Sequence, residues 1–337
     1  MNVPAGIVVL LLLLTGPLAL HFIEQNIEVY VFIIGIVATL IGPGFDRHLV
    51  VKASEEPILI TLAVIIAGIL FSFSRHRLDR AFVRLRRRIS RPLLAALATF
   101  VLGVLAGIIT AIVAALVLVE MIRLLHLKDE ARTRVTVAAC FAIGLGAALT
   151  RVGEPLSALA ASALNLPFTG LFFLLGPWIL PGVAVASVLA GWFARGDYHD
   201  SGAAVHVHET PLVAIIQAVK VYLFVAGLVL VSEAYAQIAA RLVSALSNDA
   251  LFWINTVSAV LDNATLVALE VHSMSLPRAR EAIIALLVSG GMLIPGNIPN
   301  VISAGALKIG SGAWARVGIP IGLVGLGIYF ALLKLMA

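Results

Sequence analysis

Apolar runs of about 20 residues recur along the whole chain. A helical run of that length matches the thickness of a bilayer, and in lipid only helices or closed barrels satisfy all their backbone polar groups. Charged residues make up 12% of the 337 residues, whereas soluble domains carry about 25%. We therefore predict an all-α polytopic membrane protein embedded in the lipid bilayer, with no separate soluble domain.

The charge of the chain does not indicate a nucleic-acid partner. The formal net charge of +5 reflects mostly one cluster of arginines, and aromatic residues make up only 7% of the chain. Surfaces that bind single-stranded nucleic acid combine basic grooves with aromatic side chains on which bases stack. The single cysteine, Cys140, excludes an intrachain disulfide.

The arginine cluster extends from Arg75 to Arg91 and has an apolar stripe. Apolar residues fall on one face of a helix there: Leu78, Phe82, Leu85 and Ile89. An apolar stripe beneath basic side chains is typical of a helix that lies in the membrane interface. Because basic segments stay in the cytoplasm, we predict that this segment is cytoplasmic. A solvated basic loop is the alternative structure, and it has the same location.

Landmarks in the first half of the chain recur in the second half. The Glu-x-Pro pattern at residues 55–57 recurs at 209–211, and the Gly-Glu-Pro-Leu-Ser run at 153–157 matches Gly-Asn-Ile-Pro-Asn at 296–300. These matches occur in the same order, which predicts an internal duplication. The predicted organisation is two N-terminal transmembrane helices (1–54), a first repeat (55–194), a polar linker (195–208) and a second repeat (209–337).

Each predicted repeat contains a helical hairpin and a broken transmembrane helix. The apolar segment 92–127 is too long for a single span, so we expect it to form a hairpin. Residues 251–271 are the matching hairpin of the second repeat. Each hairpin is either re-entrant or a pair of spans. In both cases a repeat crosses the membrane an odd number of times, so the second repeat has inverted topology. We expect the broken helices over 135–166 and 282–307, and a polar loop over 42–56.

Polar side chains interrupt the apolar sequence at the second hairpin and at both predicted helix breaks. Polar groups at membrane depth are costly, and they usually mark an ion or substrate path. A helix break is tolerated there only where the freed backbone groups line a cavity or are buried in protein. The candidate binding residues are Arg151, Gly153, Glu154, Ser157, Asp262, Asn263, Thr265, Gly296, Asn297 and Asn300.

The ligands that these residues offer are oxygen atoms. Carboxylate, amide and hydroxyl oxygens suit a hard cation such as sodium, and we expect Asp262, Asn263 and Asn297 to form a sodium-type site. Burial disfavours the charged form of a carboxylate. Asp262 is therefore expected to hold a proton when no cation is bound and to lose it when a cation arrives, which is a physical basis for cation/proton exchange.

The run from Asp262-Asn263-Ala-Thr265 to Gly296-Asn297 and Asn300 resembles the ion-transporter superfamily. That superfamily includes NhaD-type sodium/proton antiporters, arsenite permeases and sodium/dicarboxylate symporters. The Gly-Glu-Pro-Leu-Ser run is more similar to an uncharacterised group of cation transporters within it, and it departs from the NhaD-type pattern. The resemblance implies re-entrant hairpins and commonly a homodimer. We expect the chain to lie in the plasma (inner) membrane of a prokaryote.

The leading hypothesis is a secondary sodium/proton antiporter, with no cofactor beyond the coupling ion. The alternative is a sodium-coupled symporter of a small carboxylate or oxyanion, in which Arg151 would meet the anion. An intramembrane enzyme is a weaker hypothesis, because the sequence has no His-Glu-x-x-His and no Gly-x-Ser-x-Gly motif. A channel stays a further alternative.

Overall fold

The structure is a computed structural model that describes residues 6, 8–9, 11–13, 16, 26–42, 47–195, 211–259 and 263–336. All regular elements in these ranges are helices. Four stretches there are long and apolar enough to cross a membrane: Arg91–Ile109, Gly170–Phe193, Ala218–Tyr235 and Ser311–Leu335. The prediction of an all-helical, polytopic membrane protein is confirmed at this level. Most of the predicted first span and of the linker 195–208 lies outside the described residues.

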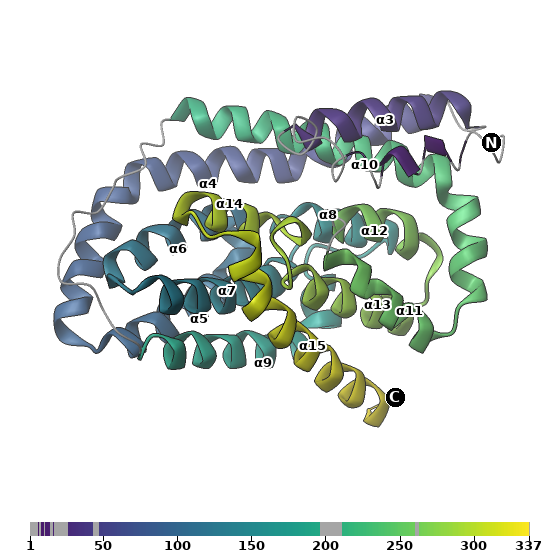
Figure 1. Cartoon of the computed structure of the whole chain (residues 1–337). Coiled ribbons are helices and arrows are strands. Elements are labelled where there is room, and N and C mark those ends of the chain that lie inside the picture. Colours follow the sequence, from purple (N-terminus) through teal and green to yellow (C-terminus); the bar gives the residue numbers. More distant parts are fainter. Residues whose placement is uncertain are drawn as a thin grey trace.

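Three helices form an outer layer: α3 (Ile27–Ile41), α4 (Arg47–Arg88) and α10 (Pro211–Ala245). Helix α10 packs against both α3 and α4. In Figure 1, α3, α4 and α10 lie together along the upper edge, and α4 and α10 then turn down on opposite sides of the molecule. The outer layer thus encloses the remaining helices on three sides in this view.

Helix α4 corrects two expectations from the sequence. The loop expected over 42–56 is helical from Arg47 onward, and the segment expected to form a separate interfacial helix is continuous with it as far as Arg88. Between Arg47 and Val64 the helix is continuous because apolar residues keep one buried face: Leu49, Ala53, Ile60 and Val64. Charged residues on the other faces of the helix are why residues 47–56 were expected to form a loop.

The first set of inner helices is α5 (Arg91–Ile109), α6 (Ala111–Leu125), α7 (Asp129–Ala147), α8 (Pro155–Ala163) and α9 (Gly170–Phe193). Helices α5 and α6 form a hairpin that turns at one residue, Thr110, and α5, α7 and α9 pack together. The expected break in the helix over 135–166 is present between α7 and α8. Pro155 is the first residue of α8, a position where the missing N–H of proline costs nothing.

The second set of inner helices follows α10, in the order α11 (Asn248–Ile254), η1 (Asn255–Ala259), α12 (Asn263–Glu270), η2 (Val271–Ser273), α13 (Leu276–Gly290), η3 (Ile294–Gly296), α14 (Ile298–Leu307) and α15 (Ser311–Leu335). The expected break in the helix over 282–307 is present between α13 and α14. Helix α8 of the first set packs against α12 of the second, and α6 packs against α14. The two sets are therefore interleaved (Figure 1).

The crossing of α5 and α7 generates a stability prediction. A methyl group on Gly146 of α7 would overlap the carbonyl oxygen of Gly103 in α5. Because backbone atoms cannot move aside as a side chain can, we expect Gly146→Ala to lower the free energy of unfolding by about 1–3 kcal/mol. Thermal unfolding of the detergent-solubilised protein measures this loss.

Gly327→Ala in α15 is the matched control, because no heavy atom beyond the neighbouring residues and backbone of its own helix lies within 4 Å of the added methyl group. We expect this variant to keep or slightly raise the unfolding temperature, since alanine is a better helix former than glycine. Equal unfolding temperatures for the two variants would contradict the close crossing of α5 and α7.

Candidate functional site

The first helix break lies against the turn of the first hairpin. The backbone N–H of Ala111 donates to the carbonyl oxygen of Gly153 at 2.8 Å. The hydroxyl of Thr150 donates to the carbonyl oxygen of Gly107. Backbone groups where α5 ends and α6 begins are thus satisfied by the segment after α7, through one backbone group and one side-chain hydroxyl, as a low-dielectric interior requires.

The second helix break lies against η1 and the end of α13. A methyl group on Gly296 would lie 2.6 Å from the carbonyl oxygen of Gly290 and 2.8 Å from that of Ser258. Both distances are too short for a real carbon–oxygen contact, so only glycine allows η1, α13 and η3 to approach this closely. The hydroxyl of Ser258 also donates to the carbonyl oxygen of Leu286 at 3.0 Å.

The two breaks, the turn at Thr110 and the start of α12 lie together in one region, which we call the junction. The side-chain nitrogen of Asn297 reaches α7 of the first set, where it would lie 2.5 Å from a methyl group on Gly144. Ile298, the first residue of α14, lines a small cavity together with Thr110 and Glu154. The second break therefore contributes residues to the surroundings of the first.

The cavity has a volume of about 10 Å³, close to the least that holds one water molecule. Thr110 lines it with φ at 74°, a backbone conformation that is rare for a β-branched residue. Strained residues of this kind cluster at functional sites. The cavity is lined by the first residues of three helices (Ala111, Pro155 and Ile298), by Thr110, Ile112, Gly153 and Glu154, and by Ile60, Val64 and Val221 of the outer layer.

Glu154 and Ser157 have a structural role at the start of α8. Glu154 is 2% exposed and is the N-cap of the helix, and the two residues form a capping box. The Ser157 hydroxyl donates to the Glu154 carbonyl oxygen at 2.7 Å and accepts from the Glu154 N–H at 3.2 Å. The carboxylate thereby lies where the helix dipole favours negative charge. Arg151 lies in the same break and is partly exposed.

Asn300 secures the second break. Its side-chain nitrogen donates to the carbonyl oxygens of Gly290 at 2.8 Å and Leu293 at 2.9 Å. These two bonds leave the amide oxygen as the remaining polar atom. That oxygen is buried and accepts no hydrogen bond from the residues that the structure describes. Asn300 is thus a structural residue that also presents an acceptor to the junction.

Asn263 also lies beside Gly290. Its side chain is 3% exposed, and its amide nitrogen would be 3.2 Å from a methyl group on Gly290. That nitrogen is buried and donates no hydrogen bond within the described part of the chain. Buried polar atoms are nearly always partnered, so such atoms need an explanation.

The structure brings several predicted residues together. Asn263, Gly296 and Asn300 surround Gly290, whereas Gly153, Glu154 and Ser157 lie at the first break. Asn297 is turned toward α7, and Thr265 is buried on α12. Asp262 lies outside the described residues, so its place in the predicted sodium-type site stays a prediction.

Sequence reasoning missed Thr110 as a lining residue of the cavity. A lone hydroxyl residue next to glycines in an apolar run was the available signal, but it did not distinguish a hairpin turn from a buried helix. The approach of Asn297 to Gly144 had no local signal at all, because the two residues belong to different halves of the chain.

A protein-family model matches residues 3–336, almost the entire chain, and its description is "Protein of unknown function (DUF1646)". The chain belongs to this family. The description names no activity, substrate or cofactor. No curated protein matches the chain. A functional assignment must therefore come from the junction itself.

Loss of the Asn300 side chain should destabilise the second break. Asn300→Ala leaves the buried carbonyl oxygen of Gly290 and the partly buried one of Leu293 without their donor, and a buried unsatisfied group costs about 1–3 kcal/mol. We expect a lower thermal unfolding temperature in detergent. Thr99→Val is the control, because the buried Thr99 hydroxyl has no hydrogen-bond partner among the described residues. A Thr99→Val loss as large as that of Asn300→Ala would contradict this role of Asn300.

Proposed function

We propose that the chain is a secondary active cation transporter whose binding site is the junction. The observation that carries the proposal is a pair of buried amide atoms, the oxygen of Asn300 and the nitrogen of Asn263, that have no partner among the described residues. Both lie where helix breaks meet in an apolar bundle. Polar groups in such a position are typical of an ion or substrate site.

The order of the helices supports a transporter with inverted repeats. From α4 to α9 and again from α10 to α15, a long helix of the outer layer is followed by a hairpin, a helix that ends at a break, a short helix and a long helix. Paired broken helices near the middle of two such repeats are the usual surroundings of a transported ion. The resemblance to the ion-transporter superfamily points in the same direction, with re-entrant hairpins and a homodimer as its finer implications.

The chemistry of the junction suits a hard cation. The Asn300 oxygen is an acceptor with free coordination capacity, and the Glu154 carboxylate is buried at the first break. Asp262 precedes Asn263 directly in the sequence and would add a second carboxylate. Exchange of a cation for a proton on one of these two carboxylates is the mechanism that we propose.

One observation favours a second function, the sodium-coupled symport of a small carboxylate or oxyanion. Helices α6, α8 and α14 all begin at the small cavity, and the positive ends of helix dipoles attract anions. The unpartnered Asn263 nitrogen is a donor, and Arg151 lies in the adjacent break. Glu154 opposes this function, because its carboxylate already lies among these helix ends.

Transport by the purified chain in proteoliposomes, with a pH dye inside, tests the proposal. Pulses of sodium, lithium and potassium should release protons for at least one of these ions. We expect Asp262→Asn to reduce the rate of cation/proton exchange to about a tenth or less. A loss of only about 1.4 kcal/mol in the free energy of cation binding already raises the dissociation constant tenfold. Glu154→Gln, measured in parallel, shows which carboxylate carries the proton.

Asp249→Asn is the control, because the exposed Asp249 pairs with Lys334 far along the chain and does not line the cavity. Its exchange rate should equal that of the parent protein. Undiminished exchange in both Asp262→Asn and Glu154→Gln would overturn the antiport mechanism.

The second function has its own signature in the same vesicles. Sodium-dependent uptake of a radiolabelled dicarboxylate that is lost in Arg151→Ala, without proton release on a cation pulse, would establish symport in place of antiport. Uptake of the dicarboxylate at the rate of protein-free vesicles would exclude it.

A further inference from the structure

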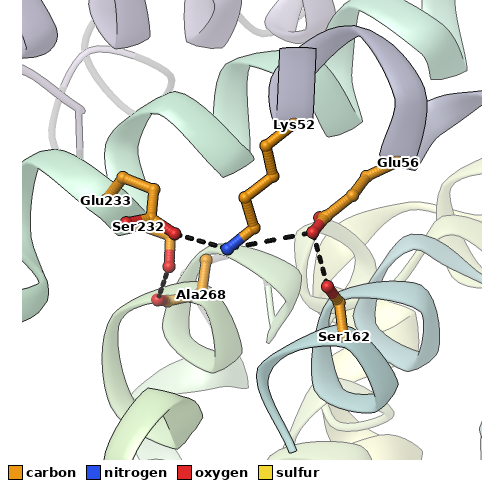
Figure 2. A network of polar contacts seen from close by, with 6 residues as sticks. All are labelled: Lys52, Glu56, Ser162, Ser232, Glu233 and Ala268. Carbon is orange, nitrogen blue, oxygen red and sulfur yellow. Dashed lines mark hydrogen bonds and ion pairs between the residues drawn. The ribbon is translucent and has the colours of Figure 1, made fainter. Parts of the chain in front are cut away.

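An ionic cluster joins the outer layer to the inner helices, and none of its side chains lines the small cavity. Figure 2 shows Lys52 of α4 between two carboxylates, Glu56 of the same helix and Glu233 of α10. The Lys52 ammonium forms an ion pair with Glu233 and lies 3.9 Å from the Glu56 carboxylate. Lys52 thus connects the two longest helices of the outer layer.

The cluster extends onto the two short helices that pack side by side. The Ser162 hydroxyl, in the last turn of α8, donates to the Glu56 carboxylate. The Ser232 hydroxyl of α10, next to Glu233, donates to the carbonyl oxygen of Ala268 in α12 at 2.5 Å (Figure 2). We name these six residues the polar clamp: Lys52, Glu56, Ser162, Ser232, Glu233 and Ala268.

The two short helices connect the polar clamp to the junction. Helix α8 begins at the first break with Pro155, and α12 begins with Asn263, whose amide nitrogen lies in the junction. Both helices are short, at nine and eight residues. A displacement of either helix as a unit would move its last turn relative to α4 and α10.

The bonds of the polar clamp can break and form again. The side chains of Lys52, Glu56 and Glu233 are 27%, 20% and 30% exposed, so water can replace each lost partner. Water that reaches an ion pair screens it and weakens the attraction. By contrast, a fully buried pair would hold the helices permanently, because separating it leaves uncompensated buried charge.

We propose that the polar clamp is a latch that holds α8 and α12 against the outer layer in the conformation of this structure. It releases when the junction changes its occupancy and the short helices move. This latch deepens the proposed transport function, and its release rests on that function, because transport is what changes the occupancy of the junction. The existence of the latch rests only on the contacts of the clamp.

Hydrogen–deuterium exchange of the full chain in lipid nanodiscs tests the latch. The double variant Ser162→Ala, Ser232→Ala removes the two bonds that reach the short helices and keeps every charge. We expect exchange in residues 155–164 and 263–270 to become about fivefold faster or more, because local opening loses two stabilising bonds. Residues 129–147 and 276–290, in α7 and α13, should exchange at the parental rate.

The matched control is Ser54→Ala, Ser187→Ala. These hydroxyls donate to carbonyl oxygens within their own helices, Val51 in α4 and Val183 in α9, so no contact between helices is lost. Exchange of α8 and α12 in this control should match the parent protein. Lys52→Met, which removes the central charge of the clamp, should accelerate the same two helices.

Two outcomes would overturn the latch. One is parental exchange in α8 and α12 of the double variant, and the other is equal acceleration in α7 and α13, which would indicate general loosening. The exchange measurement needs no ion gradient and no substrate. Faster exchange without any transport in proteoliposomes would therefore overturn the proposed function alone, and transport with unchanged exchange would overturn the latch alone.

Discussion

The structure depends on how broken helices satisfy their backbone groups in an apolar bundle. Helices α7 and α13 both stop in the interior, where each free N–H or carbonyl group is costly. The hairpin turn donates to the first break through Ala111 and Gly153, and the Asn300 side chain donates to two carbonyl oxygens at the second. The junction is therefore a structural requirement of the fold before it is a candidate binding site.

This requirement explains why structural and functional roles coincide in single residues. Asn300 closes the second break with its nitrogen and offers its oxygen to the junction. Glu154 caps α8 and places a carboxylate beside the small cavity. The polar clamp then ties the far ends of α8 and α12 to the outer layer, so a change at the junction is transmitted along two short helices to a cluster at their ends.

Several elements could be predicted from the sequence because their signals are local. Glycine, proline and polar residues inside apolar runs predicted both helix breaks, and the breaks lie between α7 and α8 and between α13 and α14. The over-long apolar segment predicted the first hairpin. The loop expected over 42–56 was wrong, because the charged residues there lie on a helix whose other face is buried against its neighbours. The local composition of residues 42–56 does not reveal this buried face, because α4 packs against α10, which lies far along the chain.

By itself, the sequence determined the class of protein and where helices stop, since hydrophobicity and backbone chemistry act within a few residues. Only the tertiary structure decided which polar atoms share the junction. It turned Asn297 toward Gly144 of the other half, and it brought the first residues of three helices to one cavity. It also placed Lys52 between carboxylates of two helices. These pairings depend on how the two halves interleave, and no local pattern carries that information.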